Sequence, residues 1–246
     1  MTAVEISDLR KTFGGIHAVD AVSMRVPAGQ RRAIIGPNGA GKTTLFNCLT
    51  GALRPTGGRV ALFGQDVTRL PEHRRAALGL ARTYQITALF PGLTVLENVL
   101  LALNGTSRRK WVLHRPIEGY ADMRAHALAA LERIGLAARS AALVRRLSYG
   151  ERRQLELALA LVRAPRVLLL DEPAAGLAPA DRGRLAEVIR AIDRAVTVIL
   201  IEHDMTIALG LADEVTVLHR GRVIVEGSPA VVQSDPRVRE VYLGIA

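Results

Sequence analysis

The chain of 246 residues lacks several features that other protein classes need. Its single cysteine, Cys48, excludes an intramolecular disulfide and any metal site built from cysteines. No apolar run approaches the roughly 18 residues of a membrane span. The start of the chain also lacks the basic and apolar regions of a signal peptide. We therefore expect a globular protein in the cytoplasm that does not itself cross a membrane.

Aromatic residues and lysines are scarce as well. Aromatics make up 4% of the chain, and lysine stands only at positions 11, 42 and 110, so the net charge of +10 comes almost entirely from arginine. Such a charge raises the hypothesis of nucleic-acid binding, for which residues 108–111 with Arg115 are the best candidate surface. That stretch holds the only tryptophan, and so few aromatics do not make a platform for stacking bases. We therefore expect no nucleic-acid partner.

The hydrophobic content of 49% excludes a mostly disordered chain, and the order of the apolar patterns predicts an α/β core interrupted by a helical insert. Thr94 and Glu97 form a capping box ahead of apolar residues at helical spacing, and an alanine-rich helix is predicted over 121–134. Two later runs are continuously apolar, which is typical of strands buried on both faces of a parallel sheet. The predicted strands cover residues 22–26, 31–35, 60–63, 167–170, 196–201, 215–218 and 223–225.

The segment from Gly36 to Thr43 matches the phosphate-loop pattern G-x-x-x-x-G-K-[ST] in full. A predicted strand leads in and a predicted helix over 43–49 leads out, so backbone N–H groups and a helix N-terminus would surround an anion. Lys42 would neutralise the β- and γ-phosphates of a nucleotide, and the Thr43 hydroxyl would ligate Mg²⁺. The predicted nucleotide-binding residues of this segment are Gly36, Pro37, Asn38, Gly39, Ala40, Gly41, Lys42, Thr43 and Thr44.

An acidic pair narrows the choice among kinases, GTPases and ATPases. The apolar run over 167–170 ends in Asp171 and Glu172, at the carboxyl end of a predicted strand, where α/β folds bind their ligands. We expect Asp171 to hold Mg²⁺ from outside the ion's direct ligands, and Glu172 to polarise a water for attack on the γ-phosphate. The alternative is that the two acids only cap the end of a strand.

The segment Leu147-Ser-Tyr-Gly-Glu151 contains a second capping box, formed by Ser148 and Glu151, which on its own is most often structural. Its position about 20 residues before the acidic pair resembles the signature of ATP-binding-cassette (ABC) ATPases. The resemblance implies that Ser148 and Gly150 bind the γ-phosphate of ATP held by the opposite subunit of a head-to-tail dimer. ATP would close this dimer and hydrolysis would open it.

Three further residues fit the order of motifs in that family. Gln85 resembles the Q-loop glutamine, which senses Mg²⁺ and the attacking water, and the alternative for it is a solvated loop amide. His203 resembles the switch histidine that contacts the γ-phosphate, although most lone histidines are not catalytic. Phe13 stands in the place of the aromatic that stacks on adenine, where the family usually has Tyr, and the alternative is a core Phe.

Two positions depart from the general family pattern. Tyr149 stands where the signature most often has Gly, and Ala178 stands where the D-loop carries the Asp of a cross-dimer polar contact. Neither departure removes a catalytic group. Together with Asp-Glu-Pro-Ala-Ala-Gly-Leu, Ile-Glu-His-Asp-Met and the ending Val241-Tyr-Leu-Gly244, they resemble the ATP-binding subunits of branched-chain (hydrophobic) amino-acid uptake transporters.

The resemblance implies the fold class, an α/β P-loop NTPase whose RecA-like core carries an antiparallel β subdomain and is interrupted by a helical subdomain. The whole chain, 1–246, would be one ABC nucleotide-binding domain. The α/β core would take 1–85 and 159–229, the helical subdomain 86–158 and a C-terminal tail 230–246.

The implied function is an ATP-hydrolysing subunit of an importer of branched-chain or other hydrophobic amino acids, at the cytoplasmic face of the inner membrane. Its partners would be a second cassette (the same chain or a paralogue), transmembrane permease subunits and, indirectly, a solute-binding protein. A permease helix would dock near Gln85, where residues 89–91 either line the groove or simply pack the insert. The alternatives are a lipopolysaccharide-export ATPase and a soluble ATPase acting on nucleic acid or ribosomes.

Overall fold

The computed structural model describes residues 1–83, 89–105 and 121–243, which divide into two compact units. The first unit comprises Met1–Arg82, Arg166–Glu172 and Ile192–Ala246, and the second comprises Thr83–Pro165 and Pro173–Ala191. The strands are β1 (Thr2–Phe13), β2 (Ile16–Pro27), β3 (Arg31–Ile35), β4 (Gly57–Leu62), β5 (Gln65–Asp66), β6 (Leu80–Arg82), β7 (Val167–Asp171), β8 (Thr197–Ile201), β9 (Glu214–His219) and β10 (Arg222–Gly227). The helices are α1 (Lys42–Thr50), α2 (Glu72–Ala77), α3 (Val95–Asn104), α4 (Ala121–Arg133), α5 (Tyr149–Leu161), α6 (Pro179–Arg190), α7 (Met205–Leu211), α8 (Pro229–Ser234) and α9 (Pro236–Leu243), with 3₁₀ turns η3 (Ala137–Arg139) and η4 (Val144–Arg146).

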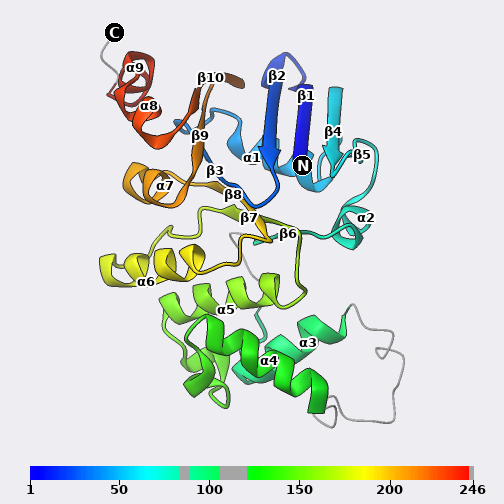
Figure 1. Cartoon of the computed structure of the whole chain (residues 1–246), viewed down its shortest axis with the longest axis vertical. Helices are drawn as coiled ribbons and strands as arrows, with labels where there is room; N and C mark the ends of the chain where they lie inside the picture. The colour runs from blue at the N-terminus through cyan, green and yellow to red at the C-terminus, as the bar shows by residue number, and fades with distance from the viewer. Residues whose placement is uncertain (84–88, 106–120, 244–246) are drawn as a thin grey trace. The chain divides into compact units, whose positions relative to one another are not determined.

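A six-stranded sheet in the order β10-β9-β3-β8-β7-β6 forms the centre of the first unit (Figure 1). Its strands are parallel except for the edge strand β10, which pairs antiparallel with β9. Every residue of β7 and β8 is buried, as predicted for their continuous apolar runs, and every residue of β3 is buried as well. Because the carboxyl ends of parallel strands share one edge, the segments that follow Ile35, Asp171 and Ile201 leave the sheet on the same side.

The first unit also contains an antiparallel sheet in the order β2-β1-β4-β5. The β1–β2 hairpin ends with the pair Phe13 and Ile16. One apolar core joins this sheet to α1 and to the parallel sheet, with Ile6, Phe46 and Leu169 among its buried members. The combination of a parallel sheet, an antiparallel sheet and helices confirms the predicted α/β fold class.

Helices dominate the second unit. The capping boxes predicted from Thr94 with Glu97 and from Ser148 with Glu151 are both formed, at the start of α3 and of α5. The alanine-rich helix α4 ends at Arg133, one residue before the predicted end. The apolar faces of α3, α4 and α5 share a core of their own, whose buried members include Val99, Leu131 and Leu155.

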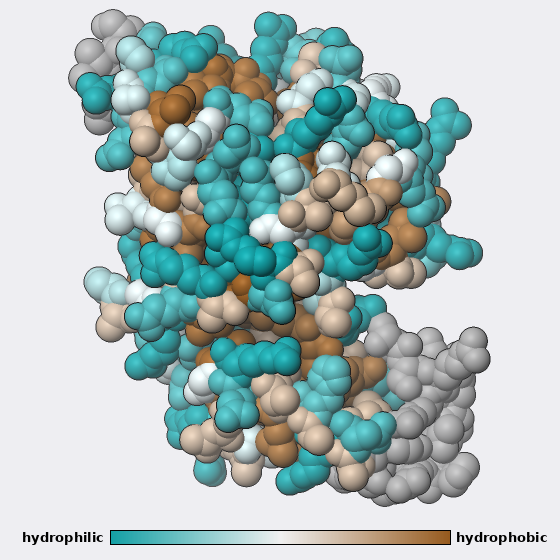
Figure 2. Space-filling view, in the orientation of Figure 1, coloured by the Kyte–Doolittle hydropathy of each residue, from teal (hydrophilic) through white to brown (hydrophobic). Residues whose placement is uncertain are grey.

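The face of the molecule shown in Figure 2 is mainly polar. On the face shown in Figure 2, hydrophilic side chains predominate and the hydrophobic colour falls into separate patches. In the described part of the chain, no helix has the length and apolar character that a bilayer crossing requires. The large hydrophobic side chains that are exposed there are those of Met1, Phe13, Ile16, Phe90, Leu101, Tyr149 and Val231.

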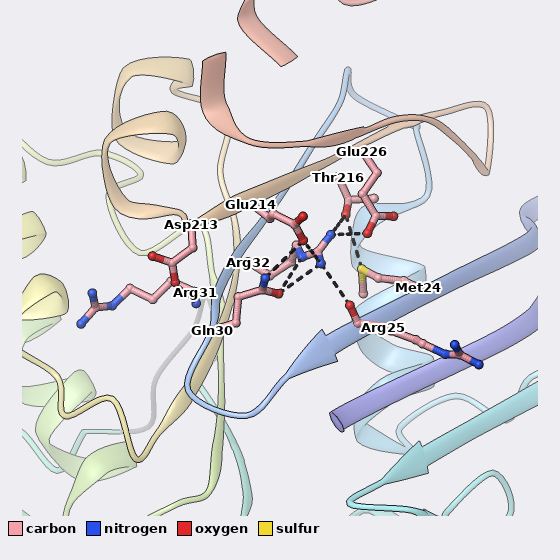
Figure 3. Close-up of polar contacts among 9 residues, drawn as sticks. All are labelled: Met24, Arg25, Gln30, Arg31, Arg32, Asp213, Glu214, Thr216 and Glu226. Atoms are coloured by element: carbon pink, nitrogen blue, oxygen red, sulfur yellow. Dashed lines mark hydrogen bonds and ion pairs between the residues drawn. The ribbon is translucent and has the colours of Figure 1, made fainter. Parts of the chain in front are cut away.

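A buried arginine fixes the strand that leads into the phosphate loop. The Arg32 side chain is 1% exposed and lies at the centre of the contacts in Figure 3. Its Nη1 donates to Thr216 Oγ1 at 3.1 Å and to Glu226 Oε1 at 2.5 Å. Its Nη2 pairs with the Glu214 carboxylate and donates to the Arg25 carbonyl oxygen at 3.0 Å. The guanidinium therefore ties β3 to β9 and β10 in one sheet and to β2 in the other.

Replacing Arg32 by Met should lower the free energy of unfolding by about 2–4 kcal/mol, because two carboxylates and a carbonyl would lose their shared donor in a partly buried site. The matched control is Arg25→Met, since the Arg25 side chain is 77% exposed and pairs with Glu5 at the surface. An exposed pair of this kind is worth about 1 kcal/mol or less. Urea unfolding followed by circular dichroism measures both changes. Equal losses in the two variants would contradict the role assigned to Arg32.

Candidate active site

The predicted phosphate loop joins β3 to α1, and its glycines are required by close backbone approaches. A Cβ on Gly36 would lie 2.1 Å from the Leu218 carbonyl oxygen, and a Cβ on Gly41 would lie 2.2 Å from the Ala18 carbonyl oxygen. Both glycines also have positive φ, of 153° and 101°. The loop is thus wedged between β2 and the end of β9, and residues with side chains do not fit at these two positions.

Lys42 is buried at the first position of α1 and is held by the loop itself. Its Nζ donates to the carbonyl oxygens of Gly36 at 2.7 Å and Pro37 at 3.0 Å. Burial lowers the pKa of Lys42, while the nearby carboxylates of Glu172 and Asp171 act in the opposite direction. A cation at the start of a helix, hydrogen-bonded to the carbonyl oxygens of Gly36 and Pro37, is well placed to bind an anion there.

The other predicted loop residues occupy the turn around this lysine. Asn38 and Gly39 are exposed at the tip, and Ala40 is buried beneath them. Thr43 is exposed and Thr44 is half-buried in the first turn of α1. The structure therefore brings the nine predicted residues, 36–44, together in one loop and one helical turn.

The far end of α1 meets a second buried cation, Arg75 of α2, which the sequence analysis did not single out. Its Nη1 donates to the carbonyl oxygens of Cys48 and Leu49, both at 2.7 Å. Its other nitrogens donate to Leu70 at 2.9 Å and Thr68 at 3.1 Å. A positive charge at a helix C-terminus complements the helix dipole in the same sense as an anion at its N-terminus.

Glu172 and His203 follow two adjacent strands of the parallel sheet and meet at its carboxyl edge. Register pairs Asp171 with Ile201, so the residues just beyond them are neighbours. Glu172 has a left-handed backbone (φ 48°), and its N–H donates to the Ile201 carbonyl oxygen at 3.0 Å. This conformation is uncommon outside glycine and often accompanies a functional site. His203 Nε2 lies 2.5 Å from Glu172 Oε1.

Asp171 is buried at the end of β7 and is paired with a residue that the sequence analysis did not assign. Arg82, the last residue of β6, donates from Nη2 to Asp171 Oδ2 at 2.6 Å. Its Nη1 donates to Asn47 Oδ1 on α1, also at 2.6 Å. The signal in the sequence was an arginine three positions before Gln85, but no local pattern connects it with an aspartate that lies 89 positions later.

Some predicted residues lie outside the described residues. Gln85, the expected Q-loop glutamine, is one of them, as are residues 108–111 and Arg115 of the candidate basic surface. Phe13 is described, and its side chain is 46% exposed, so the alternative of a core Phe is wrong. The Lys11 ammonium lies 4.9 Å from the centre of its ring. An exposed aromatic face next to a cation is available for stacking.

The predicted signature lies in the second unit, at the start of α5. The Ser148 hydroxyl accepts from the Glu151 N–H at 3.2 Å, and the Glu151 carboxylate accepts from the Ser148 N–H at 2.8 Å. Gly150 is buried, and a Cβ there would lie 2.7 Å from the Asp181 carboxyl carbon of α6. A side chain at this position would therefore displace the Asp181 carboxylate.

The two departures from the family pattern lie in segments that touch each other. The Tyr149 hydroxyl donates to the Ala175 carbonyl oxygen at 3.3 Å and accepts from Arg153 Nη2 at 2.7 Å. A Cβ on Gly176 would lie 3.4 Å from the Tyr149 ring. Tyr149 thus joins the signature helix to the segment that carries Ala178, within the second unit.

Comparison with known proteins decides the family. Residues 19–175 match the family model described as ABC transporter. The chain belongs to the ABC transporter family. It is therefore an ABC-type ATPase, and the nucleotide that such cassettes bind is ATP or its product ADP. A second model, described as branched-chain amino acid ATP-binding cassette transporter, matches residues 222–246 of this ABC cassette.

Relatives match the ABC cassette over almost its whole length. The high-affinity branched-chain amino acid transport ATP-binding protein BraF of Pseudomonas aeruginosa is 39% identical and covers 99% of this chain and 98% of its own. LivG of Salmonella typhimurium, with the same description, is 40% identical and covers 98% of this chain and 97% of its own. The lipopolysaccharide export system ATP-binding protein LptB of Acidithiobacillus ferridurans is 34% identical and covers 98% of this chain and 96% of its own. The ATP-binding cassette MJ1267 in its ADP conformation superposes with a TM-score of 0.88 at 32% identity, covering 99% of both chains.

The thiol of Cys48, in helix α1 of the ABC cassette, should be unreactive while the protein is folded. Burial raises the pKa of Cys48 to about 11, against the opposing effect of Lys11 and Arg75. At pH 8 only about one thiol in a thousand would then be ionised. Reaction with a thiol reagent such as dithionitrobenzoate should therefore proceed at the rate of unfolding. Rapid labelling of the folded protein would contradict this prediction.

The raised pKa of Cys48 also predicts that the free energy of unfolding falls as pH rises. Above about pH 8.5 the unfolded thiol loses its proton while the folded thiol keeps it, so the unfolded state binds fewer protons and stability falls as pH rises. The fall should continue up to the folded pKa of about 11. Cys48→Ala should lack this component when the unfolding free energies of both proteins are compared at pH 8 and pH 10.

Proposed function

We propose that this ABC ATPase is the ATP-hydrolysing subunit of an importer of branched-chain or other hydrophobic amino acids. The observation that carries the proposal is the match of the C-terminal residues 222–246, in addition to the ABC match, to a model of branched-chain amino acid cassettes. The relatives BraF and LivG, at 39% and 40% identity over nearly complete chains, support the same substrate class.

Lipopolysaccharide export is the second candidate, because the LptB relative covers 96% of its own length. Its identity of 34% is lower than the 39% of BraF and the 40% of LivG. The C-terminal match also favours amino-acid import. We therefore keep import as the proposal and lipopolysaccharide export as an outcome of the test.

The site residues suit a magnesium nucleotide. The Thr43 hydroxyl and the Asp171 carboxylate belong to the same unit and offer the oxygen donors that Mg²⁺ prefers. Among the described residues there is no cluster of three His, Cys, Asp or Glu that would hold a metal alone, which fits an ion bound jointly by few protein groups and by phosphates. When bound, Mg²⁺ would neutralise charge on the β- and γ-phosphates. Lys42 and the loop N–H groups would bind the phosphates, and Phe13 would stack on the base.

The pair Glu172 and His203 supports base-assisted hydrolysis. Glu172 would take a proton from the attacking water as the water oxygen bonds to the γ-phosphorus. The bond between the γ-phosphorus and the β,γ-bridging oxygen would break, leaving ADP and phosphate. His203, 2.5 Å from Glu172 Oε1, would hold the carboxylate in position and contact the γ-phosphate. Gln85 would contribute beside Mg²⁺ and the water.

The assembly we propose is a head-to-tail pair of cassettes, either two copies of this chain or this chain with a paralogue. Lys42 and Thr43 would come from one subunit, and Ser148 and Gly150 from the other. The position of Ser148 supports this role, because it lies at the N-terminus of α5 and a helix N-terminus is a ready site for a phosphate.

The pair would bind transmembrane permease subunits at the cytoplasmic face of the membrane, and through them act with a solute-binding protein. Phe90 supports a docking role, because it is 55% exposed while its backbone is held in place. The Asn98 side chain accepts from the Phe90 N–H at 2.9 Å and donates to its carbonyl oxygen at 3.2 Å. An aromatic side chain presented from a fixed backbone suits a partner surface.

Replacing Glu172 by Gln should lower kcat for ATP hydrolysis at least about 100-fold, because a general base would be lost, and leave nucleotide affinity close to that of the wild type. Phosphate release and titration calorimetry measure the two quantities. As the control, Lys42→Ala should weaken nucleotide binding itself. A Glu172→Gln protein that turns over ATP at the wild-type rate would show that the base is another group.

Transport tests the substrate class. Cells that lack this gene should lose most uptake of labelled leucine at micromolar concentration, and a plasmid copy should restore it, whereas a Glu172→Gln copy should not. The tagged Glu172→Gln protein should also recover permease subunits from solubilised membranes. Normal leucine uptake together with a defect in surface lipopolysaccharide would favour the export alternative, and recovery of a soluble partner alone would contradict both.

A further inference from the structure

The ion pair between Arg82 and Asp171 is buried on both sides. The two side chains are 7% and 2% exposed, whereas Arg59 and Asp66, an ion pair of the same unit, are 55% and 52% exposed. Removing both charges from water costs several kcal/mol, and a buried ion pair often gives no net stability over an apolar pair. Stability alone therefore does not account for Arg82 at this position.

Packing and hydrogen bonding hold the Arg82 guanidinium in place. Nη2 is bonded to Asp171 Oδ2 and Nη1 to Asn47 Oδ1, each at 2.6 Å. The guanidinium carbon also lies 5.8 Å from the centre of the Phe46 ring on α1. Strand pairing places Arg82 beside Leu169, so the side chain reaches along β7 to the carboxylate. A fixed positive charge thus lies against one oxygen of Asp171.

We propose that Arg82 is the resident counter-ion of Asp171 and that its charge sets how strongly this carboxylate attracts Mg²⁺. The inference rests on the magnesium role proposed for Asp171. Both cations would neutralise one carboxylate, so each reduces the gain from the other. Arg82 holds the Asp171 carboxylate in one orientation whether or not a nucleotide is bound, and its positive charge weakens the binding of the metal at this site. It is a positioning residue and does not touch the reacting atoms.

The proposal predicts a change in the coupling between Mg²⁺ and nucleotide. The measured quantity is the ratio of the ADP dissociation constant in EDTA to that in Mg²⁺, obtained by titration calorimetry on the full chain. Removing a unit positive charge beside the site of a divalent cation, in a medium of intermediate dielectric, corresponds to at least about a tenfold change in that ratio. Arg82→Gln should therefore raise the ratio at least about tenfold, and Arg82→Lys, which keeps the charge, should stay within about threefold of the wild type.

Two matched variants separate charge from structure. Asn47→Ala removes the second bond of the guanidinium and keeps its charge, and Arg59→Gln makes the same substitution at an exposed ion pair. Both should leave the ratio unchanged. An Arg82→Gln ratio equal to or below that of the wild type would overturn the proposal, as would an equal rise in Asn47→Ala.

Asp171→Asn distinguishes failure of this inference from failure of the proposed magnesium site. It should lower the ratio if Asp171 acts on the metal, and an unchanged ratio in this variant would overturn the magnesium role and the inference together. Thermal unfolding without metal or nucleotide gives an independent check on folding. Arg82→Gln should lower Tm by about 5–15 °C, and adding Asp171→Asn should recover at least half of the loss, because the uncompensated charge is then gone. No recovery would overturn the counter-ion assignment.

Discussion

The structure of the first unit depends on finding partners for charged side chains that are buried away from water. Arg32, Lys42, Arg75 and Asp171 are all buried there, and an unpaired charge in such a place would cost several kcal/mol. Each is met by groups of opposite or partial charge: carboxylates around Arg32, carbonyl oxygens around Lys42 and Arg75, and a guanidinium beside Asp171. These same contacts position β3, α1 and β7, so the elements that carry the site are fixed by the need to pair their buried charges.

Helix α1 shows how this constraint serves the site. Its C-terminal carbonyls are occupied by Arg75, and its side is linked through Asn47 and Arg82 to Asp171. Its N-terminus begins at Lys42, with Gly41 as the preceding residue. A helix anchored at its end and side keeps its positive pole aimed in one direction. The binding of an anion at that pole then needs little reorganisation, which is the condition for a strong electrostatic site.

Local patterns in the sequence predicted most of the fold and the two motifs of the first unit. The strand over 31–35, both capping boxes and the buried run before Asp171 depend on residues within a few positions of each other, and each appears where it was expected. The Arg82 contact with Asp171 joins residues 89 positions apart, and periodicity contains no information on such a pair. The left-handed backbone of Glu172 was not predicted either, because it accompanies a hydrogen bond to Ile201 on the neighbouring strand, which no local pattern shows.

Composition predicted the function less well than the motifs did, because it treats every arginine as a surface charge. Arg32 and Arg75 are buried and donate their hydrogen bonds inside the protein. Part of the net charge of +10 therefore has a structural cause and gives no evidence of a binding partner. Tyr149 shows that a departure from a motif can also have a structural cause. Seen alone, it is a departure from the signature pattern, but its hydroxyl bonds the backbone of the segment in which Ala178 is the second departure. Tyr149 therefore contacts, through Ala175, the segment of the second unit that carries Ala178.

The distribution of lysine and arginine follows from what each position must do. Arg32, Arg75 and Arg82 make several fixed bonds at once, which a planar fork with five donors does well. Lys42 is different, because its compact ammonium is held by two carbonyl oxygens of the loop that we propose binds phosphate. An ammonium on a flexible stem exchanges such partners for phosphate oxygens without losing a set geometry. Compared with the buried side chains of Arg32, Arg75 and Arg82, Lys42 is therefore the cation whose partners, we propose, change when phosphate binds.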